Sequence, residues 1–225
     1  MDFIFMLTRN DQTVADALDL VETVRPLGLS HIGFKDIGVD HDVLVRLTAA
    51  IRAAGAKVWM EVVSTTREGE LQSLRIARDL GVDAVMGGTA VDEGLTLLAG
   101  SGLEYLPFSG RPRGHPTELD GFAHEVEAQC AAYMGNGCAG SDLLAYRATQ
   151  SDPLALIAAA RRGLGGGRLV VAGSVNTPER IRAVAQTGAD AFTIGTAAIE
   201  GSYAPGAGGL AAQLAAIVRD CERAG

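Results

Sequence analysis

Short apolar runs alternate with longer amphipathic stretches from one end of the chain to the other. The short runs end at small or polar residues, which is typical of buried strands. They predict eight strands, at residues 3–7, 31–35, 57–63, 84–86, 104–108, 143–146, 169–172 and 191–194. Between them, apolar side chains recur at helical spacing, so we predict a helix after each strand.

Capping residues and glycines support this division of the chain. Asn10 or Asp11 is placed to cap the first helix, and Gly28 to end it. Asp152 and Pro153 open a later helix with a capping side chain and a proline in the first turn. Strands that alternate with helices predict a parallel sheet covered by helices.

Eight such units predict an α/β fold, a single (β/α)8 TIM barrel that forms one domain over residues 1–225. An open doubly wound sheet is the alternative, but no GxGxxG motif follows the first strand. Residues 81–94 and 188–201 match without a gap at eight of fourteen positions, 107 residues apart. This repeat suggests a duplicated half-barrel, although glycine and alanine also align easily by chance.

The composition of the chain limits the kinds of partner and the cellular location that we expect for the protein. The chain is 48% apolar and 20% charged, as expected of a globular protein. Its net charge of −8 disfavours nucleic acid and anionic membrane surfaces, since both attract basic proteins. No apolar run is as long as a membrane helix, and the start of the chain lacks the basic residues of a signal peptide. Three cysteines without a CxxC pair fit a reducing compartment, so we expect a cytoplasmic protein.

Metals and cofactors leave no signature in the chain. No histidines and cysteines have metal-ligand spacing, and no nicotinamide or flavin fingerprint is present. We therefore expect no metal and no cofactor, with a flavin bound through a phosphate site as the alternative. A homodimer is expected only because dimers are the commonest oligomers.

The candidate chemistry begins at the last two predicted strands. These end in Gly173-Ser174 and Gly195-Thr196. Glycine lets backbone amides approach a ligand, the start of a helix leaves N–H groups unbonded, and Ser or Thr adds a hydroxyl. The pattern predicts a phosphate-binding site, although an ordinary tight turn uses the same residues. In the repeat, Gly88 and Thr89 suggest a second anion site.

Segments 172–175 (AGSV) and 194–197 (IGTA) resemble the phosphate loops of the ribulose-phosphate-binding barrels. This group includes the phosphoribosyl isomerase and cyclase of histidine biosynthesis, the barrels of tryptophan biosynthesis, ribulose-phosphate 3-epimerase and related decarboxylases. The resemblance implies a small phosphorylated substrate whose phosphate is held by four residues, Gly173, Ser174, Gly195 and Thr196.

The catalytic residues of three members of this group have no evident counterpart in this chain. The histidine-pathway barrels carry aspartates at the ends of their first and fifth strands, where this chain has Thr8-Arg9 and Phe108-Ser109. The metal-binding residues of the epimerase are absent, as is the Asp-x-Lys-x-x-Asp motif of the decarboxylases on residues 57–63. The resemblance therefore implies a phosphate site but no particular reaction.

Strand alternation predicts which charged side chains enter the barrel. Ile32 and Phe34 suit the layer under the helices, which turns Lys35 inward at the C-terminal end. Glu61 is expected inside, because a carboxylate under the helices would be buried without a partner. Arg147 follows the sixth predicted strand and is expected at the same end. Active sites of this fold lie there, so Lys35, Glu61 and Arg147 are candidate catalytic residues.

Four further residues are expected around them as lid or substrate contacts: Arg9, Asp36, Ser109 and His115. His115 lies in the loop SGRPRGHPTELDG, which is long enough to form a lid. Simpler interpretations stay open. Lys35 and Glu61 would then form only an ion pair, and Arg147 would only bind a substrate anion.

Three functions fit these residues. In a lyase or aldolase, Lys35 attacks a carbonyl to form a Schiff base, or polarises it, while Glu61 moves protons. In a sugar-phosphate isomerase or epimerase, Lys35 stays protonated and Glu61 shuttles a proton between neighbouring carbons. In a non-catalytic barrel that binds a phosphorylated metabolite, the two residues do no more than pair.

Overall fold

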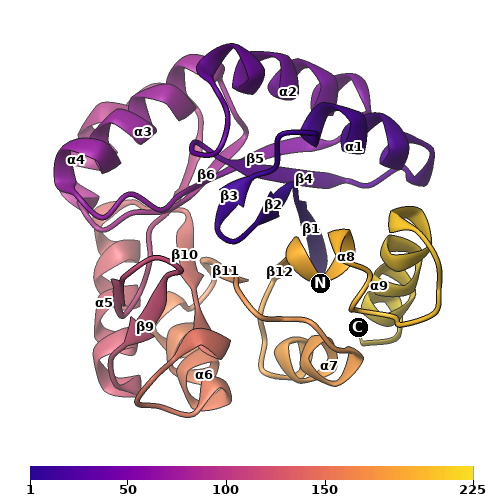
Figure 1. Ribbon diagram of the computed structural model, residues 1–225. Coiled ribbons are helices and arrows are strands. Elements are labelled where there is room, and N and C mark those ends of the chain that lie inside the picture. Colours follow the sequence, from indigo (N-terminus) through magenta and orange to yellow (C-terminus); the bar gives the residue numbers. More distant parts are fainter. Residues whose placement is uncertain (225) are drawn as a thin grey trace.

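Eight parallel strands form one sheet that curls round on itself in the computed structural model, which describes residues 1–224 (Figure 1). In sheet order the strands are β10 (Gly140–Leu143), β11 (Arg168–Val171), β12 (Ala191–Ile194), β1 (Asp2–Met6), β4 (His31–Lys35), β5 (Lys57–Val62), β6 (Ala84–Gly87) and β7 (Glu104–Leu106). Phe108, just after β7, bridges Asp142 of β10, and the Asp142 amide donates to Pro107 O at 3.0 Å. These contacts join the two outer strands, so the predicted (β/α)8 barrel is confirmed.

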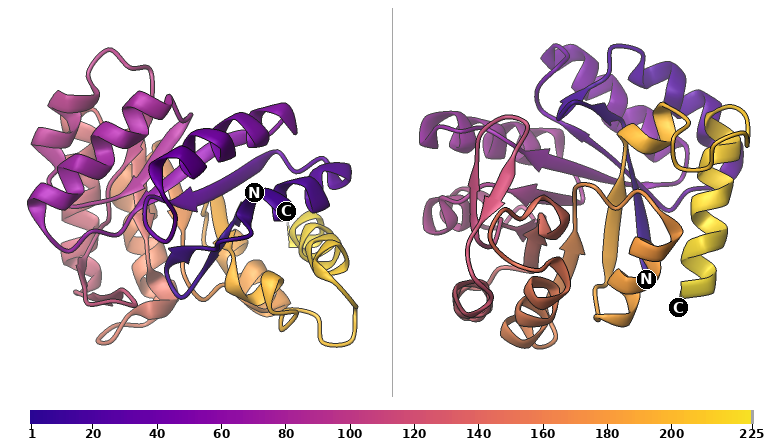
Figure 2. Two further views of the ribbon diagram at one scale, coloured as in Figure 1. Left: turned by 45° about the horizontal axis from the view of Figure 1, so that its top comes forward. Right: turned by 60° about the horizontal axis from the view of Figure 1, so that its bottom comes forward.

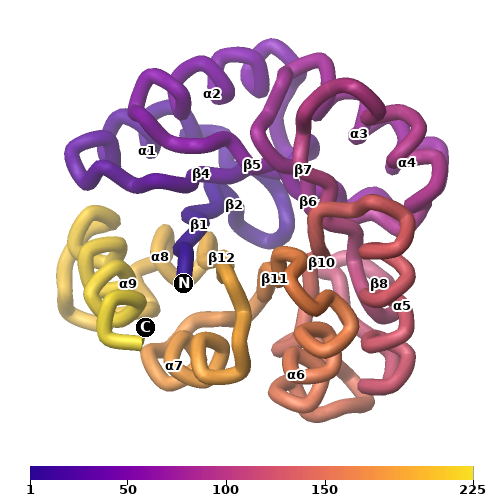
Figure 3. The backbone as a smooth tube through the Cα atoms, turned by 180° about the vertical axis from the view of Figure 1, so that it is seen from behind, coloured from indigo at the N-terminus to yellow at the C-terminus, as the bar shows by residue number. Residues whose placement is uncertain are grey.

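Helices surround the strands on the outside of the ring (Figures 1 and 2). They are α1 (Ala17–Val24), α2 (His41–Ala53), α3 (Arg67–Leu80), α4 (Val91–Leu98), α5 (Ala123–Asn136), α6 (Pro153–Leu164), α7 (Pro178–Gln186), α8 (Thr196–Ile199) and α9 (Leu210–Ala224). The side chains of Asp152 and Thr177 cap α6 and α7, and each helix has proline in its first turn. The two chain ends lie close together (Figure 3), where Cys221 Sγ lies 3.0 Å from Met1 O.

The first helix begins later than predicted. Residues 8–13 form a hairpin of β2 (Thr8–Arg9) and β3 (Gln12–Thr13), and α1 starts only at Ala17. Asn10 and Asp11 form the two-residue turn of this hairpin. Their φ angles are 51° and 58°, a left-handed backbone conformation that Asn and Asp tolerate. The prediction that one of them caps α1 is therefore wrong, and the turn brings Asp11 to the mouth of the barrel.

The sixth barrel strand begins earlier than predicted. It was expected at 143–146, but β10 covers Gly140–Leu143, and a 3-10 turn, η2 (Ala145–Arg147), follows it. Because Ser141 and Asp142 are polar, the pattern of apolar residues does not indicate a strand here, although both residues are fully buried. The strand therefore places a carboxyl group inside the protein.

The long loop predicted as a lid forms a second hairpin, of β8 (Arg111–Arg113) and β9 (Glu118–Asp120). Leu119 is buried and bridges the backbone of Ala148, beside η2. The amide of Thr149 also donates to Leu119 O at 3.0 Å. The hairpin is thus anchored to the chain segment that carries Arg147.

The barrel interior is apolar in its middle and lower parts. The inner cluster consists of Ile4, Met6, Trp59, Ala84, Met86, Leu106, Val170 and Ala191. At the N-terminal end of the strands, Trp59 Nε1 donates to His31 Nδ1 at 3.0 Å. Arg168 closes that end by pairing with Asp2 at 2.7 Å and Glu104 at 3.2 Å. Because apolar and paired groups fill this end, chemistry is left to the other end of the strands.

Candidate active site

A cavity of about 390 Å³ opens at the C-terminal ends of the barrel strands. Lys35, Glu61 and Arg147, the three predicted catalytic residues, all line it. The same cavity is lined by the four predicted phosphate-binding residues: Gly173, Ser174, Gly195 and Thr196. The structure therefore brings the two predicted groups of residues together in one place, where this fold carries its active sites.

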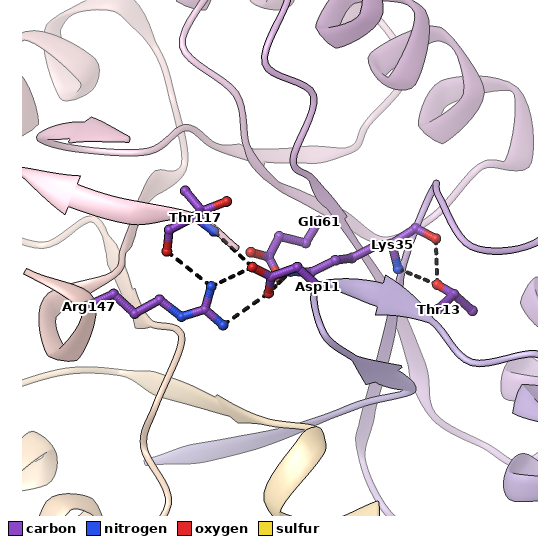
Figure 4. Close-up of polar contacts among 6 residues, drawn as sticks. All are labelled: Asp11, Thr13, Lys35, Glu61, Thr117 and Arg147. Carbon is purple, nitrogen blue, oxygen red and sulfur yellow. Dashed lines mark hydrogen bonds and ion pairs between the residues drawn. The ribbon is translucent and has the colours of Figure 1, made fainter. Parts of the chain in front are cut away.

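Asp11 joins the charged side chains of this cavity (Figure 4). Lys35 Nζ lies 2.8 Å from Asp11 Oδ1. The Arg147 guanidinium donates from Nη1 to Asp11 Oδ2 at 2.6 Å and from Nη2 to Oδ1 at 3.0 Å. The Thr117 amide donates to Oδ2 at 3.0 Å. We call these four residues the Asp11 clasp; it ties both hairpins to β4 and η2.

Asp11 and Arg147 stabilise each other's charged forms within the clasp. Burial alone would raise the pKa of the Asp11 carboxyl, but the hydrogen bonds and charges of Arg147 and Lys35 outweigh it and hold that pKa well below its usual range. Burial would lower the pKa of Arg147, but the bonds and charge of Asp11 raise it instead. Asp11 is therefore a poor proton acceptor near neutral pH.

Sequence reasoning missed the position of Asp11. An Asn-Asp pair before a helix has the composition of a cap, and this composition predicts the wrong role for Asp11. A signal for the hairpin was present, since Thr8 and Thr13, residues typical of strands, lie two positions before and after the pair. Only the fold shows that this turn meets Arg147, 136 residues further along the chain.

Lys35 lies between two carboxylates. Its Nζ is 3.4 Å from Glu61 Oε2, and the two side chains are only 4% and 6% exposed. The residues are direct neighbours in the register of β4 and β5. Thr13 fixes the backbone of Lys35, because its hydroxyl accepts from the Lys35 amide at 2.8 Å and donates to Lys35 O at 2.6 Å. The predicted pair of Lys35 and Glu61 is thus held rigidly by its surroundings.

Asp142 is a further acidic residue that sequence reasoning missed. Its side chain has no accessible surface, and neither carboxyl oxygen has a hydrogen-bond partner within residues 1–224. Burial and the charge of Glu61 raise its pKa well above the ordinary range, against the opposing charges of Lys35 and Arg147. The carboxyl therefore keeps its proton at pH values where an exposed aspartate is ionised.

Backbone amides gather at the predicted phosphate loops. Within the described residues, the amides of Ser174, Val175, Thr196 and Ala197 donate no hydrogen bond. All four residues line the cavity. Such unbonded N–H groups fit the oxygens of an anion.

Close packing explains both glycines of these loops. Gly173 has a φ of 73°, and a Cβ there would collide with the Arg147 side chain. A Cβ on Gly195 would lie 2.7 Å from Thr8 Oγ1 and 2.8 Å from the carbonyl oxygens of Met6 and Thr8. The loops therefore need glycine to let neighbouring chain segments approach, in addition to any ligand.

We expect Gly195→Ala to lower the free energy of unfolding by roughly 1–3 kcal/mol, because the added methyl group overpacks a site bounded by backbone. Chemical denaturation followed by circular dichroism measures this. Gly135→Ala in α5, where a Cβ would meet no atom within 4 Å, is the matched control and should not destabilise the protein. Equal stability of the two variants would contradict the packing argument.

The predicted second anion site is filled by the protein itself. Glu70 Oε1 accepts hydrogen bonds from the amides of Thr89 and Ala90, both at 2.6 Å, and Glu70 Oε2 lies 3.2 Å from the Thr89 hydroxyl. The amides of Thr89 and Ala90 therefore do receive an anion, but it is a buried carboxylate of α3. The amides expected to bind a ligand anion there are thus already bonded, although Gly88 and Thr89 also line a second cavity of about 530 Å³. Strands β6 and β12, which carry the repeat, are four places apart in the sheet and lie on opposite sides of the ring.

The residues predicted as lid or substrate contacts separate into two groups. Two point away from the cavity: Asp36 bonds Ser73 of α3, and Ser109 is buried against Ser141 at 2.9 Å. Their predicted role is wrong, because strand alternation turns both toward the helices. Two lie near the mouth: Arg9 pairs at 3.3 Å with Glu200, which lines the cavity, and exposed His115 stands in the turn of the β8–β9 hairpin.

Solved structures share this fold. The chain aligns with a structure described as native KDPGal over 99% of its own length and 97% of the other chain, with a TM-score of 0.67 and 14% identity. It also aligns with orotidine 5'-phosphate decarboxylase from Pyrococcus horikoshii OT3 over 98% of its own length and 99% of the other chain, with a TM-score of 0.64 and 13% identity. The alignment with thiamine phosphate pyrophosphorylase from Pyrococcus furiosus covers 99% of this chain and 96% of the other, with a TM-score of 0.58 and 13% identity. No protein-family model and no curated protein sequence matches the chain. At these identities the likeness establishes the fold, a TIM barrel.

Residues 1–224 contain neither a candidate membrane-spanning helix nor a cluster of metal ligands. No helix there combines the length and apolar character needed to cross a membrane. No three side chains of His, Cys, Asp or Glu in that range are grouped to hold a metal ion. The acidic residues of the cavity are instead arranged around Lys35 and Arg147.

Proposed function

We propose that the protein is an enzyme of the lyase or aldolase type that acts on a small phosphorylated keto compound. One observation carries this proposal: a buried lysine and a set of unbonded backbone amides line the same cavity. The amides at 174–175 and 196–197 would hold the phosphate, and Lys35 would meet the carbonyl group. The names of two fold neighbours, a phosphate-compound decarboxylase and a pyrophosphorylase, are consistent with this substrate class.

Lys35 has the setting of a functional amine. It is one of only two lysines in a chain that otherwise uses arginine for positive charge, and the other, Lys57, is exposed. Arginine forms better permanent ion pairs, whereas lysine can lose its proton and attack a carbonyl. Glu61 is the neighbour placed to accept that proton, because Arg147 and Lys35 keep Asp11 ionised.

The proposed chemistry begins when the Lys35 nitrogen forms a bond to the carbonyl carbon. The two protons that the nitrogen loses depart with the carbonyl oxygen as water, which leaves a protonated imine. A base then removes the proton of a substrate hydroxyl, and the adjacent C–C bond breaks with its electron pair passing into the imine. Glu61 is the carboxylate closest to Lys35 at the cavity that can serve as this base.

Isomerisation is the second candidate. The favouring observation is the distance of 2.8 Å between Lys35 and Asp11, since a carboxylate so close supports the charged ammonium form. A charged Lys35 would polarise the substrate carbonyl without bonding to it, and Glu61 would move a proton between neighbouring carbons. In that case no covalent adduct forms.

Borohydride reduction separates these functions. We expect phosphorylated ketones and aldehydes, tested as a panel, to leave one reduced adduct that intact mass and peptide mapping place on Lys35. The adduct should persist in Lys57→Arg and disappear in Lys35→Arg, so the two lysines control for each other. Turnover without an adduct would favour the isomerase. Binding without turnover across the panel would favour a non-catalytic protein.

Thr196→Glu should weaken the affinity for such a phosphorylated compound at least tenfold, because it sets a carboxylate among the phosphate-binding amides. Isothermal titration calorimetry measures this change. Thr96→Glu on the exposed side of α4 adds the same charge far from the cavity and should leave affinity unaltered. If both variants bind equally well, the phosphate lies elsewhere.

A further inference from the structure

The acidic residue that the proposed chemistry leaves unused is Asp142. It lies on β10 in register with Val170, a member of the inner cluster, so its side chain faces the barrel interior. In sheet order β10 is separated from β4 by three strands and stands across the ring from it. Asp142 therefore approaches Lys35 and Glu61 from the opposite wall.

In the described part of the chain, this barrel interior contains three carboxyl groups but only two cationic side chains to balance them. Lys35 and Arg147 supply two positive charges, and Asp11 and Glu61 supply two negative charges in direct ion pairs with them. A third carboxylate would leave a net negative charge among these buried side chains, which costs several kcal/mol. Asp142, the carboxyl that makes no hydrogen bond within residues 1–224, is the group that must keep a proton.

The groups around Asp142 define where that proton can go. The charged ones are Lys35 of β4, Glu61 of β5 and Arg147 of η2, and all three act on the ionisation of Asp142. Its partners on the flanking strands, Phe108 and Val170, are apolar. Of the charged groups, Glu61 is the one that can accept a proton.

We propose that Asp142 and Glu61 share one proton, and that this pair is the acid of the site, with Glu61 facing the substrate and Asp142 storing the proton beneath it. This inference rests on the proposed function. When Glu61 carries the proton, its O–H bond breaks with the electron pair remaining on oxygen, and the carbanion-like carbon left by C–C cleavage forms the new C–H bond. Glu61 regains a proton when it deprotonates the hydroxyl group of the next substrate. Asp142 is thus a positioning residue that acts through Glu61.

The first test needs no substrate. In protein labelled with 13C in the Asp and Glu carboxyl groups, NMR titration should show one carboxyl that loses its proton at a clearly higher pH than the exposed aspartates, and Asp142→Asn should remove its signal. Glu61→Gln should shift the midpoint of that signal downward by at least one pH unit, because the charge of Glu61 is gone. Glu104→Gln, at the other end of the barrel, is the control and should not shift it. A midpoint near that of free aspartate, or one unmoved by Glu61→Gln, would overturn the shared proton.

The second test uses whichever phosphorylated ketone of the panel forms the Lys35 adduct, with fructose 1-phosphate as the first probe, because it carries a hydroxyl group on the second carbon from its carbonyl, as the proposed C–C cleavage requires. Asp142→Asn should slow product formation at least tenfold and remove one limb of the pH–rate profile, with KM unchanged. An unchanged profile would overturn the proton relay even if the proton is shared. If no compound reacts, the proposed function fails, and the NMR titration still decides whether the pair holds a common proton.

Discussion

Asp11→Asn is expected to lower the free energy of unfolding by about 3 kcal/mol at pH 7, because it breaks a buried ion-pair group and leaves Arg147 without its carboxylate. For a chain of this size the melting temperature should fall by roughly 6–12 °C. Asparagine tolerates the φ of 58° at this position, so the substitution tests charge and not backbone strain. Differential scanning calorimetry measures the change.

The pH dependence of this loss has a defined sign. The pKa of Asp11 is lowered in the folded protein, so its stabilising effect is complete above the unfolded pKa of about 3.9 and is lost as pH falls toward the folded value. Wild type and Asp11→Asn should therefore become more alike in stability below about pH 4. Asp16→Asn, an exposed change in the same segment, should stay within about 0.5 kcal/mol of wild type at every pH. A constant gap between wild type and Asp11→Asn from pH 7 to 3 would contradict the ion-pair explanation.

Lys35→Met is expected to abolish the borohydride adduct and to destabilise the fold by roughly 3–5 kcal/mol, because Glu61 is then buried without a cation. Methionine keeps most of the volume of lysine, so little of this loss comes from a cavity. A second change, Glu61→Gln, should restore much of the stability of Lys35→Met, since it removes the unpaired charge. Thermal unfolding of the single and double variants measures the coupling.

Lys57→Met serves as the control for this series, because Lys57 is exposed at the start of β5 and should tolerate the change. If Glu61→Gln adds a further loss to Lys35→Met, the two residues are not coupled by charge. Recovery of stability without recovery of the adduct is the expected combination. It would separate the role of Lys35 in packing and charge from its proposed role as a nucleophile.

The sequence predicted the barrel well because the information it needs is local. Strand length, helix periodicity and caps repeat every few residues, and β4 and β12 have the predicted bounds, 31–35 and 191–194. Alternation along β4 and β5 also predicted that Lys35 and Glu61 reach the same end of the barrel, where both line the cavity. Burial of an unpaired charge is so costly that the facing of these residues follows from their neighbours on the strand.

The partners of these residues depend on contacts between distant segments. Nothing near Asp11 in the chain indicates that it meets Arg147, and a polar run conceals β10 and with it Asp142. Gly88 and Thr89 have the local features of an anion site, yet Glu70 of the preceding helix fills it. Local pattern thus determined the elements, their order and the inward side chains. Tertiary structure decided which charges meet inside the ring, because low-dielectric electrostatics depends on distances in space that spacing along the chain does not encode.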